Sequence, residues 1–257
     1  AVQSMLHWED PEKNREMLEK KIANISEKVD LVVLPEMFTT GFSMNVNSLA
    51  EATTSDITLE WMKSLSQRHG FAITGSVMMS ENSQFFNRLL WVDPQGDSRH
   101  YDKRHLFRMA NEDEFYAAGT EKLIVNFRGW NICPLICYDL RFPVWSRNQY
   151  FLTGNKEYDA LYDVLIYVAN WPSPRKNAWQ TLLRARAIEN QCFVVGVNRV
   201  GMDGNTVHYN GDTAIIDFKG EDLKVSAQAT DQILYSEISM EALKAFRKKF
   251  PVGLDAD

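Results

Sequence analysis

The sequence predicts an α/β protein with mixed sheets. Continuous apolar runs such as Leu31–Leu34 and Val164–Ala169 are typical of strands that are buried on both faces and need helices on each side. Stretches with helical periodicity alternate with such runs in both halves of the chain, and tight turns join other strands into hairpins. This repetition favours two sheets packed together with helices outside over one doubly wound sheet.

The composition is that of an ordinary globular protein. The chain has 257 residues, of which 45% are hydrophobic and 24% charged, so it can bury a core without a disulfide or a metal. Its 28 Lys and Arg against 34 Asp and Glu give a net charge of −6, which argues against nucleic acid or an anionic membrane as a partner. No linker or repeat divides the sequence, so we expect a single domain over residues 1–257.

Cysteine usage points to a reducing compartment. Cys133, Cys137 and Cys192 form no CxxC pair and leave an odd thiol. The apolar stretches are far shorter than the roughly 20 residues that span a bilayer, and the first residues lack the features of a signal peptide. We therefore expect a cytoplasmic protein that makes no membrane contact.

The N-terminal half opens with a helix and a strand. Asp10 and Pro11 have the form of an N-cap followed by proline at the first helical position, and apolar residues at spacings of three and four extend the predicted helix to Asp30. The strand Leu31–Leu34 follows. Further along we expect a helix over 56–69, a strand over 71–79, and two hairpins that pair 87–92 with 98–101 and 123–127 with 130–136.

The C-terminal half repeats the alternation. Gly154, Asn155 and several charged residues indicate a surface loop over 151–161. Around it we expect a helix over 142–150, a strand over 164–169, a helix over 177–190, a strand over 192–198, a hairpin that pairs 213–217 with 223–226, a strand over 232–238 and a helix over 240–250.

Three reactive side chains follow predicted strands. Glu36, Lys103 and Cys137 each lie at the carboxyl end of a strand, where open α/β sheets place their sites. Taken singly, an exposed glutamate, a solvated turn and a buried structural cysteine are the commoner interpretations. Together they favour one site, because a cysteine nucleophile needs a base and an electrophilic stabiliser, which Glu and Lys supply without histidine. The helix expected after Cys137 would lower the pKa of its thiol.

These segments resemble the nitrilase superfamily of carbon–nitrogen hydrolases, most closely the YafV-type omega-amidases (2-oxoglutaramate amidases). The resemblance extends from residue 3 to residue 257. It rests on the runs LPEMFTTGF (34–42), YDKRHLFRMA (101–110), CYDLRFPVWSRN (137–148), YVANWP (167–172) and RAIENQ (186–191).

The resemblance implies a four-layer αββα sandwich with mixed sheets, and no metal or organic cofactor. It implies that Glu36 is the general base, Lys103 the oxyanion stabiliser and Cys137 the nucleophile. Glu112 stands where such enzymes often have a second glutamate, although its acidic neighbours leave an exposed loop as the alternative. The resemblance also implies a homodimer, for which 144–150 and 179–183 are candidate interface segments that equally suit the core.

The reaction implied is cleavage of the terminal amide of a small dicarboxylic acid monoamide, such as 2-oxoglutaramate or succinamate, through a thioester. We expect the backbone N–H near Tyr138 to help hold the oxyanion. Arg141 is the first candidate to bind the free carboxylate, with a structural ion pair to Asp139 or to a glutamate left open as the alternative. The weaker candidates are the cations Arg108 and Lys176; the candidate pocket walls are Phe42, Trp171, Phe38 and Trp179, for which core packing is the commoner interpretation.

Three alternatives stay open. The chain resembles other hydrolases of the superfamily as well, namely deaminated-glutathione amidases, nitrilases and carbamoylases. A catalytically silent binding or scaffold protein on the same fold is a second alternative, disfavoured by the intact Glu36, Lys103 and Cys137. A cysteine hydrolase paired with His105 is the third, although we expect this histidine to face the surface.

Overall fold

Two mixed β-sheets form the middle of the computed structural model, which describes residues 1–154 and 157–256. The first sheet has the strand order β2-β4-β5-β6, with β3 paired to β4. Strand β2 is parallel to β4, whereas β5 is antiparallel to both β4 and β6. The strands of this sheet are β2 (Leu31–Val33), β3 (Glu51–Ala52), β4 (Ala72–Glu81), β5 (Gln84–Val92) and β6 (Ser98–Asp102).

The second sheet has the strand order β16-β15-β12-β11-β8-β7. Its central strands β8, β11 and β12 are parallel, and its outer strands pair antiparallel as the predicted hairpins. The strands of this sheet are β7 (Val125–Phe127), β8 (Trp130–Ile136), β11 (Val164–Ala169), β12 (Phe193–Asn198), β15 (Ala214–Ile216) and β16 (Asp222–Val225).

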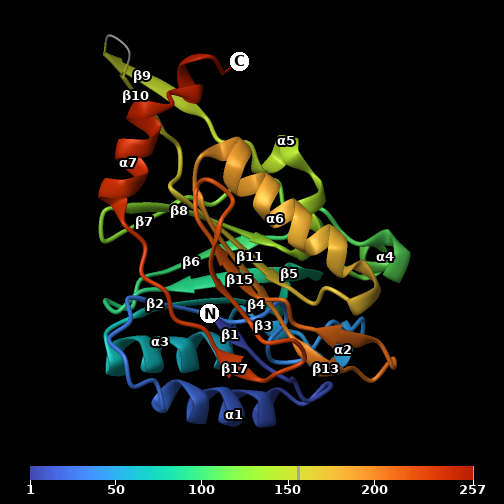
Figure 1. Cartoon of the computed structure of the whole chain (residues 1–257). Helices are drawn as coiled ribbons and strands as arrows, with labels where there is room; N and C mark the ends of the chain where they lie inside the picture. The colour runs from blue at the N-terminus through green and yellow to red at the C-terminus, as the bar shows by residue number, and fades with distance from the viewer. Residues whose placement is uncertain (155–156, 257) are drawn as a thin grey trace.

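Helices cover the outer face of each sheet and complete four layers (Figure 1). Helices α1 (Pro11–Ala23) and α3 (Ile57–His69) lie against the first sheet, and α6 (Lys176–Asn190) and α7 (Met240–Lys249) lie on the far side of the second. This arrangement confirms the predicted αββα sandwich. In the part of the chain that the structure describes, no helix is both long and apolar enough to cross a membrane.

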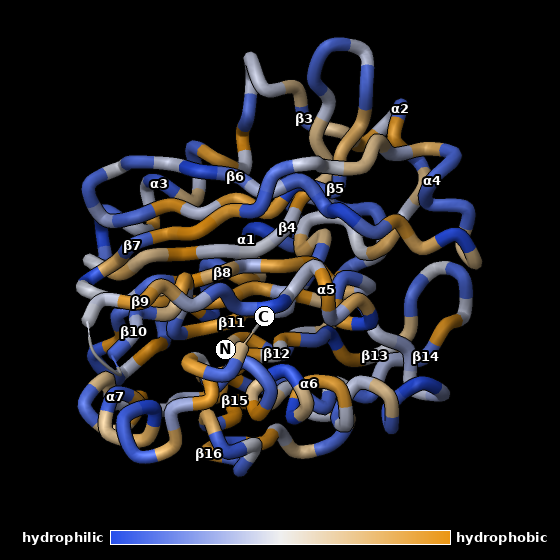
Figure 2. The backbone as a smooth tube through the Cα atoms, turned by 90° about the horizontal axis from the view of Figure 1, so that it is seen from above, coloured by the Kyte–Doolittle hydropathy of each residue, from blue (hydrophilic) through white to orange (hydrophobic). Residues whose placement is uncertain are grey.

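Alternation along the strands divides the apolar side chains between two cores. Val33 packs with Leu135 and Val164 in the core between the sheets, whereas Val32 and Leu34 pack with α1 and α3. Successive side chains of a strand point to opposite faces, so one strand serves both cores. In Figure 2 the hydrophobic stretches follow the strands through the middle of the molecule, and the peripheral loops are mostly hydrophilic.

Two helices begin where the sequence predicts. The side chains of Asp10 and Asp56 each accept a backbone N–H of the first turn, at 3.1 and 2.8 Å, and so satisfy groups that would otherwise lack partners. The predicted extension of the first helix is wrong, because α1 ends at Ala23. Ile25 and Val29 still pack against the core from irregular chain, which explains why the apolar spacing continues beyond the helix.

Two predictions between β8 and β11 are also wrong. The predicted helix 142–150 is reduced to α5 (Pro143–Ser146). The predicted surface loop 151–161 is an antiparallel ribbon of β9 (Tyr150–Gly154) and β10 (Glu157–Ala160), with Asn155 and Lys156 outside the described residues. Most side chains of this ribbon are exposed, and its strands are short and flanked by glycine and charged residues, so the sequence has the signals of a loop.

Several short strands and helices differ from the sequence predictions or were not predicted. The predicted strand 232–238 is only β17 (Gln232–Ile233), which pairs with β1 (Val2–Gln3). A ribbon of β13 (Val200–Met202) and β14 (His208–Asn210) has no apolar run to announce it. The short helices α2 (Val46–Leu49) and α4 (Glu112–Phe115) were likewise not predicted.

Gly75 on β4 allows a close approach that fixes the segment after β2. A Cβ there would lie 2.8 Å from both the Leu34 Cβ and the Phe38 Cδ1. We expect Gly75→Ala to lower the free energy of unfolding by about 1–3 kcal/mol, as overpacking of a core does. Gly154→Ala is the matched control, because a Cβ there meets none of the described residues within 4 Å. Urea denaturation measures both, and equal stabilities would contradict this account.

Candidate active site

Polar side chains from both sheets meet at one end of the sandwich. Glu36 lies just past β2, Lys103 directly follows β6, and Cys137 directly follows β8. Strands β2 and β6 run in the same direction, because each of the pairs β4–β5 and β5–β6 reverses it. Strands with a common direction end at the same edge of a sheet, which brings Glu36 beside Lys103.

The ammonium group of Lys103 lies between two carboxylates. Its Nζ donates to Glu36 Oε1 at 2.9 Å and to both carboxylate oxygens of Glu112 at 2.9 Å. All three side chains are fully buried. Glu112 is the first residue of α4 and also accepts the backbone N–H of Phe107 at 2.6 Å. The alternative of an exposed acidic loop therefore fails for Glu112, although Glu114 is exposed.

The charges of Lys103, Glu36 and Glu112 shift the pKa values of their neighbours. Burial by itself would lower the pKa of Lys103, but the negative charges of Glu112 and Glu36 outweigh it and raise that pKa above its ordinary value. Lys103 therefore stays an ammonium ion at any physiological pH. Burial raises the pKa of Glu112, and the charge of Glu36 raises it further, while Lys103 acts in the opposite direction.

Two asparagines hold the Glu36 carboxylate in place. The backbone N–H of Asn170, just past β11, donates to Glu36 Oε2 at 2.7 Å, and its side-chain Nδ2 donates to the Glu36 backbone carbonyl at 2.7 Å. Asn87 on β5 donates to Glu36 Oε1 at 2.8 Å and to Glu112 Oε1 at 3.2 Å. Neither asparagine was predicted from the sequence. Asn170 follows an apolar strand as Cys137 does, so the same rule would have found it.

Cys137 occupies a sharp bend between β8 and the 3-10 helix η2 (Cys137–Arg141). Its φ is +41°, in the left-handed region that side-chain-bearing residues rarely adopt. The sulfur lies 3.9 Å from the carbonyl oxygen of Asn170. Burial raises the pKa of the Cys137 thiol well above its usual value, and Glu36 raises it further, while Lys103 opposes them. The expectation of a lowered pKa is therefore wrong, because burial and the charge of Glu36 outweigh the charge of Lys103.

A group of contacts around Asp139, called the brace below, stabilises this bend. The buried Asp139 carboxylate accepts the backbone N–H of Ile136 at 3.1 Å and the hydroxyl of Tyr101 at 2.7 Å. The Nδ1 of His105 lies 2.8 Å from the same carboxylate, and its ring stacks on Phe142 with 3.8 Å between centroids. His105 is thus half-buried in the brace rather than at the surface.

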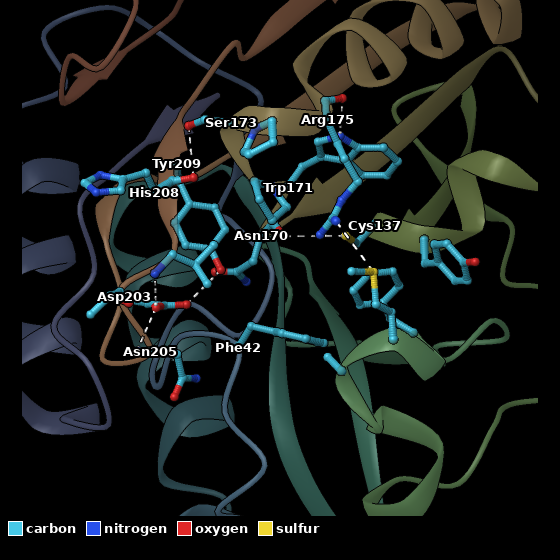
Figure 3. A pocket seen from close by; sticks show the side chains of 18 of the residues that line it. Phe42, Cys137, Asn170, Trp171, Ser173, Arg175, Asp203, Asn205, His208 and Tyr209 are labelled. Carbon is cyan, nitrogen blue, oxygen red and sulfur yellow. Dashed lines mark hydrogen bonds between the residues drawn. The ribbon is translucent and has the colours of Figure 1, made fainter.

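A cavity of about 700 Å³ opens above the cysteine. Cys137 and Lys103 line it, and so do all four predicted substrate-binding residues, which are Tyr138, Arg141, Trp171 and Phe42. Figure 3 shows Cys137 on one side of this space and the segment from Asp203 to Tyr209 on the other. That segment contains the turn between β13 and β14 and the start of β14, so the ribbon that the sequence did not predict supplies the far wall.

Two arginines line the cavity. Arg141 is exposed and lies over the Trp171 ring at 5.1 Å, and the ion pair with Asp139 that the sequence left open does not form. Arg175, in the 3-10 helix η3 (Ser173–Arg175), lies over the Phe107 ring at 5.1 Å. Nothing in the sequence distinguished Arg175 from a surface arginine.

Other sequence candidates lie outside the cavity. Phe38 is fully buried in the core under α1 and α3, and Trp179, which belongs to α6, is fully buried in the core cluster of the second sheet. Arg108 forms an exposed ion pair with Asp113, and Lys176 lies 3.3 Å from Asp212. Within residues 1–154 and 157–256, no group of three or more His, Cys, Asp or Glu side chains is arranged to hold a metal ion.

The sequence matches known families along its length. The model of the carbon-nitrogen hydrolase family matches residues 1–248. The chain is 46% identical over 256 residues to the omega-amidase YafV of Escherichia coli, covering 100% of this chain and 95% of that protein. It is 34% identical over 255 residues to a 2-oxoglutaramate amidase of Bacillus subtilis, covering 98% of this chain and 94% of the relative.

Solved structures share the fold. A CN-hydrolase superfamily protein from Xanthomonas campestris, whose crystal structure carries an arsenic adduct in the active site, superposes with a TM-score of 0.94 at 47% identity, covering 100% of this chain and 95% of that chain. A nitrilase superfamily member from Saccharomyces cerevisiae superposes with a TM-score of 0.83 at 21% identity, covering 98% and 93% of the two chains, which shows the fold alone.

The raised pKa of Cys137 has a kinetic signature in the free protein. Below its pKa, the thiolate fraction grows tenfold for each pH unit, so we expect the rate of alkylation by iodoacetamide to rise about tenfold per unit between roughly pH 7 and 9 without a plateau. Cys137→Ala should abolish native-state labelling, because Cys133 and Cys192 are fully buried and burial raises the pKa of Cys133 to about 12. A plateau beginning near neutral pH would contradict the raised pKa.

Proposed function

This chain belongs to the carbon–nitrogen hydrolase family, and we propose that it is an omega-amidase. The reaction is hydrolysis of the terminal amide of a small dicarboxylic acid monoamide, of the 2-oxoglutaramate or succinamate type, to the acid and ammonia. One observation carries the proposal: a cysteine opens into a cavity beside a buried Glu36–Lys103 pair, and the same cavity contains arginines. The full-length similarity to omega-amidases supports the substrate class.

The first half of the reaction forms a thioester. Glu36 accepts the proton of the Cys137 thiol as the sulfur attacks the amide carbonyl, so the thiolate arises only when its electrophile is in place. The oxygen of the tetrahedral intermediate takes up negative charge, which the Lys103 ammonium and the Tyr138 backbone N–H stabilise. Each well-placed donor contributes roughly 3–4 kcal/mol. Glu36 then returns the proton to the leaving nitrogen, and ammonia departs.

The second half regenerates the thiol. Glu36 removes a proton from a water molecule that attacks the thioester carbonyl, and the C–S bond breaks as the tetrahedral intermediate collapses. The sulfur recovers its proton from Glu36, and the carboxylic acid leaves. Asn170 and Asn87 keep both oxygens of Glu36 oriented through this cycle, because three of their N–H groups bind that carboxylate within 3.4 Å.

Glu112 positions Lys103 in this scheme. Its two oxygens each accept from the ammonium at 2.9 Å, while the backbone N–H of Phe107 fixes the carboxylate itself. Glu112 thus acts through Lys103. It holds the ammonium beside Glu36, in the position where it can stabilise the oxyanion.

The cavity walls provide for a substrate with a free carboxylate. Arg141 is the proposed anchor, because it projects over Trp171 and takes part in no ion pair among the described residues. Phe42 and Tyr138 line the same space, and Phe42 also packs over the Lys103 ammonium at 5.2 Å. The acyl chain between amide and carboxylate would lie along these apolar surfaces.

We further propose that two chains pair through their outer helices. Helices α5 and α6 lie near one another on the outer face in Figure 1, where Val144 is 90% exposed and Ile188 is 55% exposed. Trp179 and Leu183 are fully buried, so they belong to the core and leave this surface to α5 and the exposed side of α6.

The proposed chemistry draws only on side-chain and backbone groups of the protein and on water, and it uses no cofactor. We also propose a cytoplasmic location. The three cysteines are free and buried, which suits a compartment that keeps thiols reduced.

Ammonia release tests the reaction directly. We expect the protein to release ammonia from 2-oxoglutaramate and succinamate at rates well above those with glutamine, a nitrile or an N-carbamoyl amino acid. Cys137→Ala should lose at least about a thousandfold in kcat, because no nucleophile remains. Unchanged activity in this variant would overturn the mechanism, and activity only with a nitrile or a carbamoyl compound would select another reaction of the family.

The carboxylate anchor has its own test. We expect Arg141→Ala to raise KM for succinamate about 10- to 100-fold, the loss expected for a hydrogen bond to a charged group. A neutral amide such as butyramide should be hydrolysed at nearly the same kcat/KM by both proteins. Equal losses on the two substrates, measured by ammonia release, would reject the anchor role.

A further inference from the structure

The cavity contains more positive charge than one carboxylate explains. Besides Lys103, which has its own carboxylates, Arg141 and Arg175 both line it, and neither pairs with an acidic side chain among the described residues. Arg175 is half-buried against Phe107, and its Nη1 lies 3.8 Å from the Met109 sulfur. A guanidinium held against apolar and thioether groups is weakly satisfied, so it favours an anionic or strongly accepting ligand.

Trp171 contacts both arginines. Arg141 lies over its ring at 5.1 Å, and its indole N–H donates to the Arg175 backbone carbonyl at 2.8 Å. The arginines thus enter the cavity from two different 3-10 helices, and both helices contact the same indole. In Figure 3 the Arg175 side chain extends from beside Trp171 into the space near Cys137.

The carboxylate that lines the cavity is already occupied. Asp203 Oδ1 accepts the backbone N–H groups of Asn205 and Val207 at 2.8 and 3.0 Å, and its Oδ2 accepts the Tyr209 hydroxyl at 2.9 Å. Three of the roughly four acceptor positions of the Asp203 carboxylate are therefore filled by its own segment, which leaves little of it for an ammonium group of a ligand. The cavity consequently suits a head group composed of oxygens and disfavours a 2-amino acid.

We propose that Arg175 is a second anchor, which acts with Arg141 to bind the 2-oxo acid head group of the substrate. Such a head group presents three oxygens, two from the carboxylate and one from the ketone. A bidentate pair of N–H groups from one guanidinium matches the two carboxylate oxygens, and the second guanidinium can then donate to the ketone oxygen. Arg175 thereby sets the preference for 2-oxo amides over their unsubstituted and 2-amino counterparts. This inference rests on the proposed function.

The test compares substrates that differ at one carbon atom. These are 2-oxoglutaramate, glutaramate, which lacks the ketone, and glutamine, which carries an amine there. We expect Arg175→Ala to raise KM for 2-oxoglutaramate roughly 10- to 100-fold with kcat changed less than about threefold, and to change KM for glutaramate less than about threefold. Arg175→Lys, which keeps the charge but loses the fork, should give an intermediate KM. Neither variant alters the backbone carbonyl that fixes Trp171.

Arg108→Ala is the matched control, because it removes an arginine close to the cavity that is already paired with Asp113. It should leave all three kinetic profiles unchanged. A general effect of charge would instead appear in both variants and would overturn the inference. Equal losses of Arg175→Ala on 2-oxoglutaramate and glutaramate, or no loss on either, would overturn it as well.

A binding measurement separates this inference from the proposed function. Calorimetry in the Cys137→Ala background compares 2-oxoglutarate with glutarate, with and without Arg175→Ala, and needs no turnover. Selective loss of 2-oxoglutarate affinity supports the anchor, and its absence removes it. If the unaltered protein hydrolyses none of the panel, the proposed function fails, whichever result the calorimetry gives.

Discussion

A single buried ammonium group holds this site together. Lys103 has the carboxylates of Glu36 and Glu112 as its partners, and all three side chains are shielded from water. Without Lys103, two carboxylates would remain in the interior, and one unpaired buried charge already costs several kcal/mol. The contacts join the chain that follows β2, the end of β6 and the start of α4. The geometry of the reaction centre therefore depends on the packing of the whole first sheet.

The strand ends were the part of the site open to sequence reasoning. Apolar runs before Glu36 and Cys137 strongly indicate strands. The rule that sites lie at the carboxyl ends of strands then predicted that the side chains after them share one site. The same runs predicted two sheets with outer helices, and the turn at residues 93–96 predicted a hairpin. A structural feature could be predicted wherever the residues that determine it lie within one short segment of the sequence.

What could not be predicted depends on contacts between distant segments. Asn87 lies inside a strand, and its partner Glu36 is 51 residues away, so no local pattern announces it. Arg175 can be recognised as a candidate site residue only from its position in the cavity wall. The first helix was extended too far because Ile25 and Val29 remain apolar after the helix has ended. The thiol pKa was misjudged because the local helix start favoured a thiolate, whereas burial, a property of the folded whole, opposes it.

Burial of the Cys137 thiol also bears on oxidative damage. Peroxides attack the thiolate form of cysteine, and oxidation beyond the sulfenic acid is irreversible in most proteins. A sulfur that keeps its proton until an amide arrives is a poor target for such oxidants between turnovers. In the proposed mechanism, the raised pKa of Cys137 therefore provides a nucleophile that is unreactive at rest, which Glu36 activates only during the catalytic cycle.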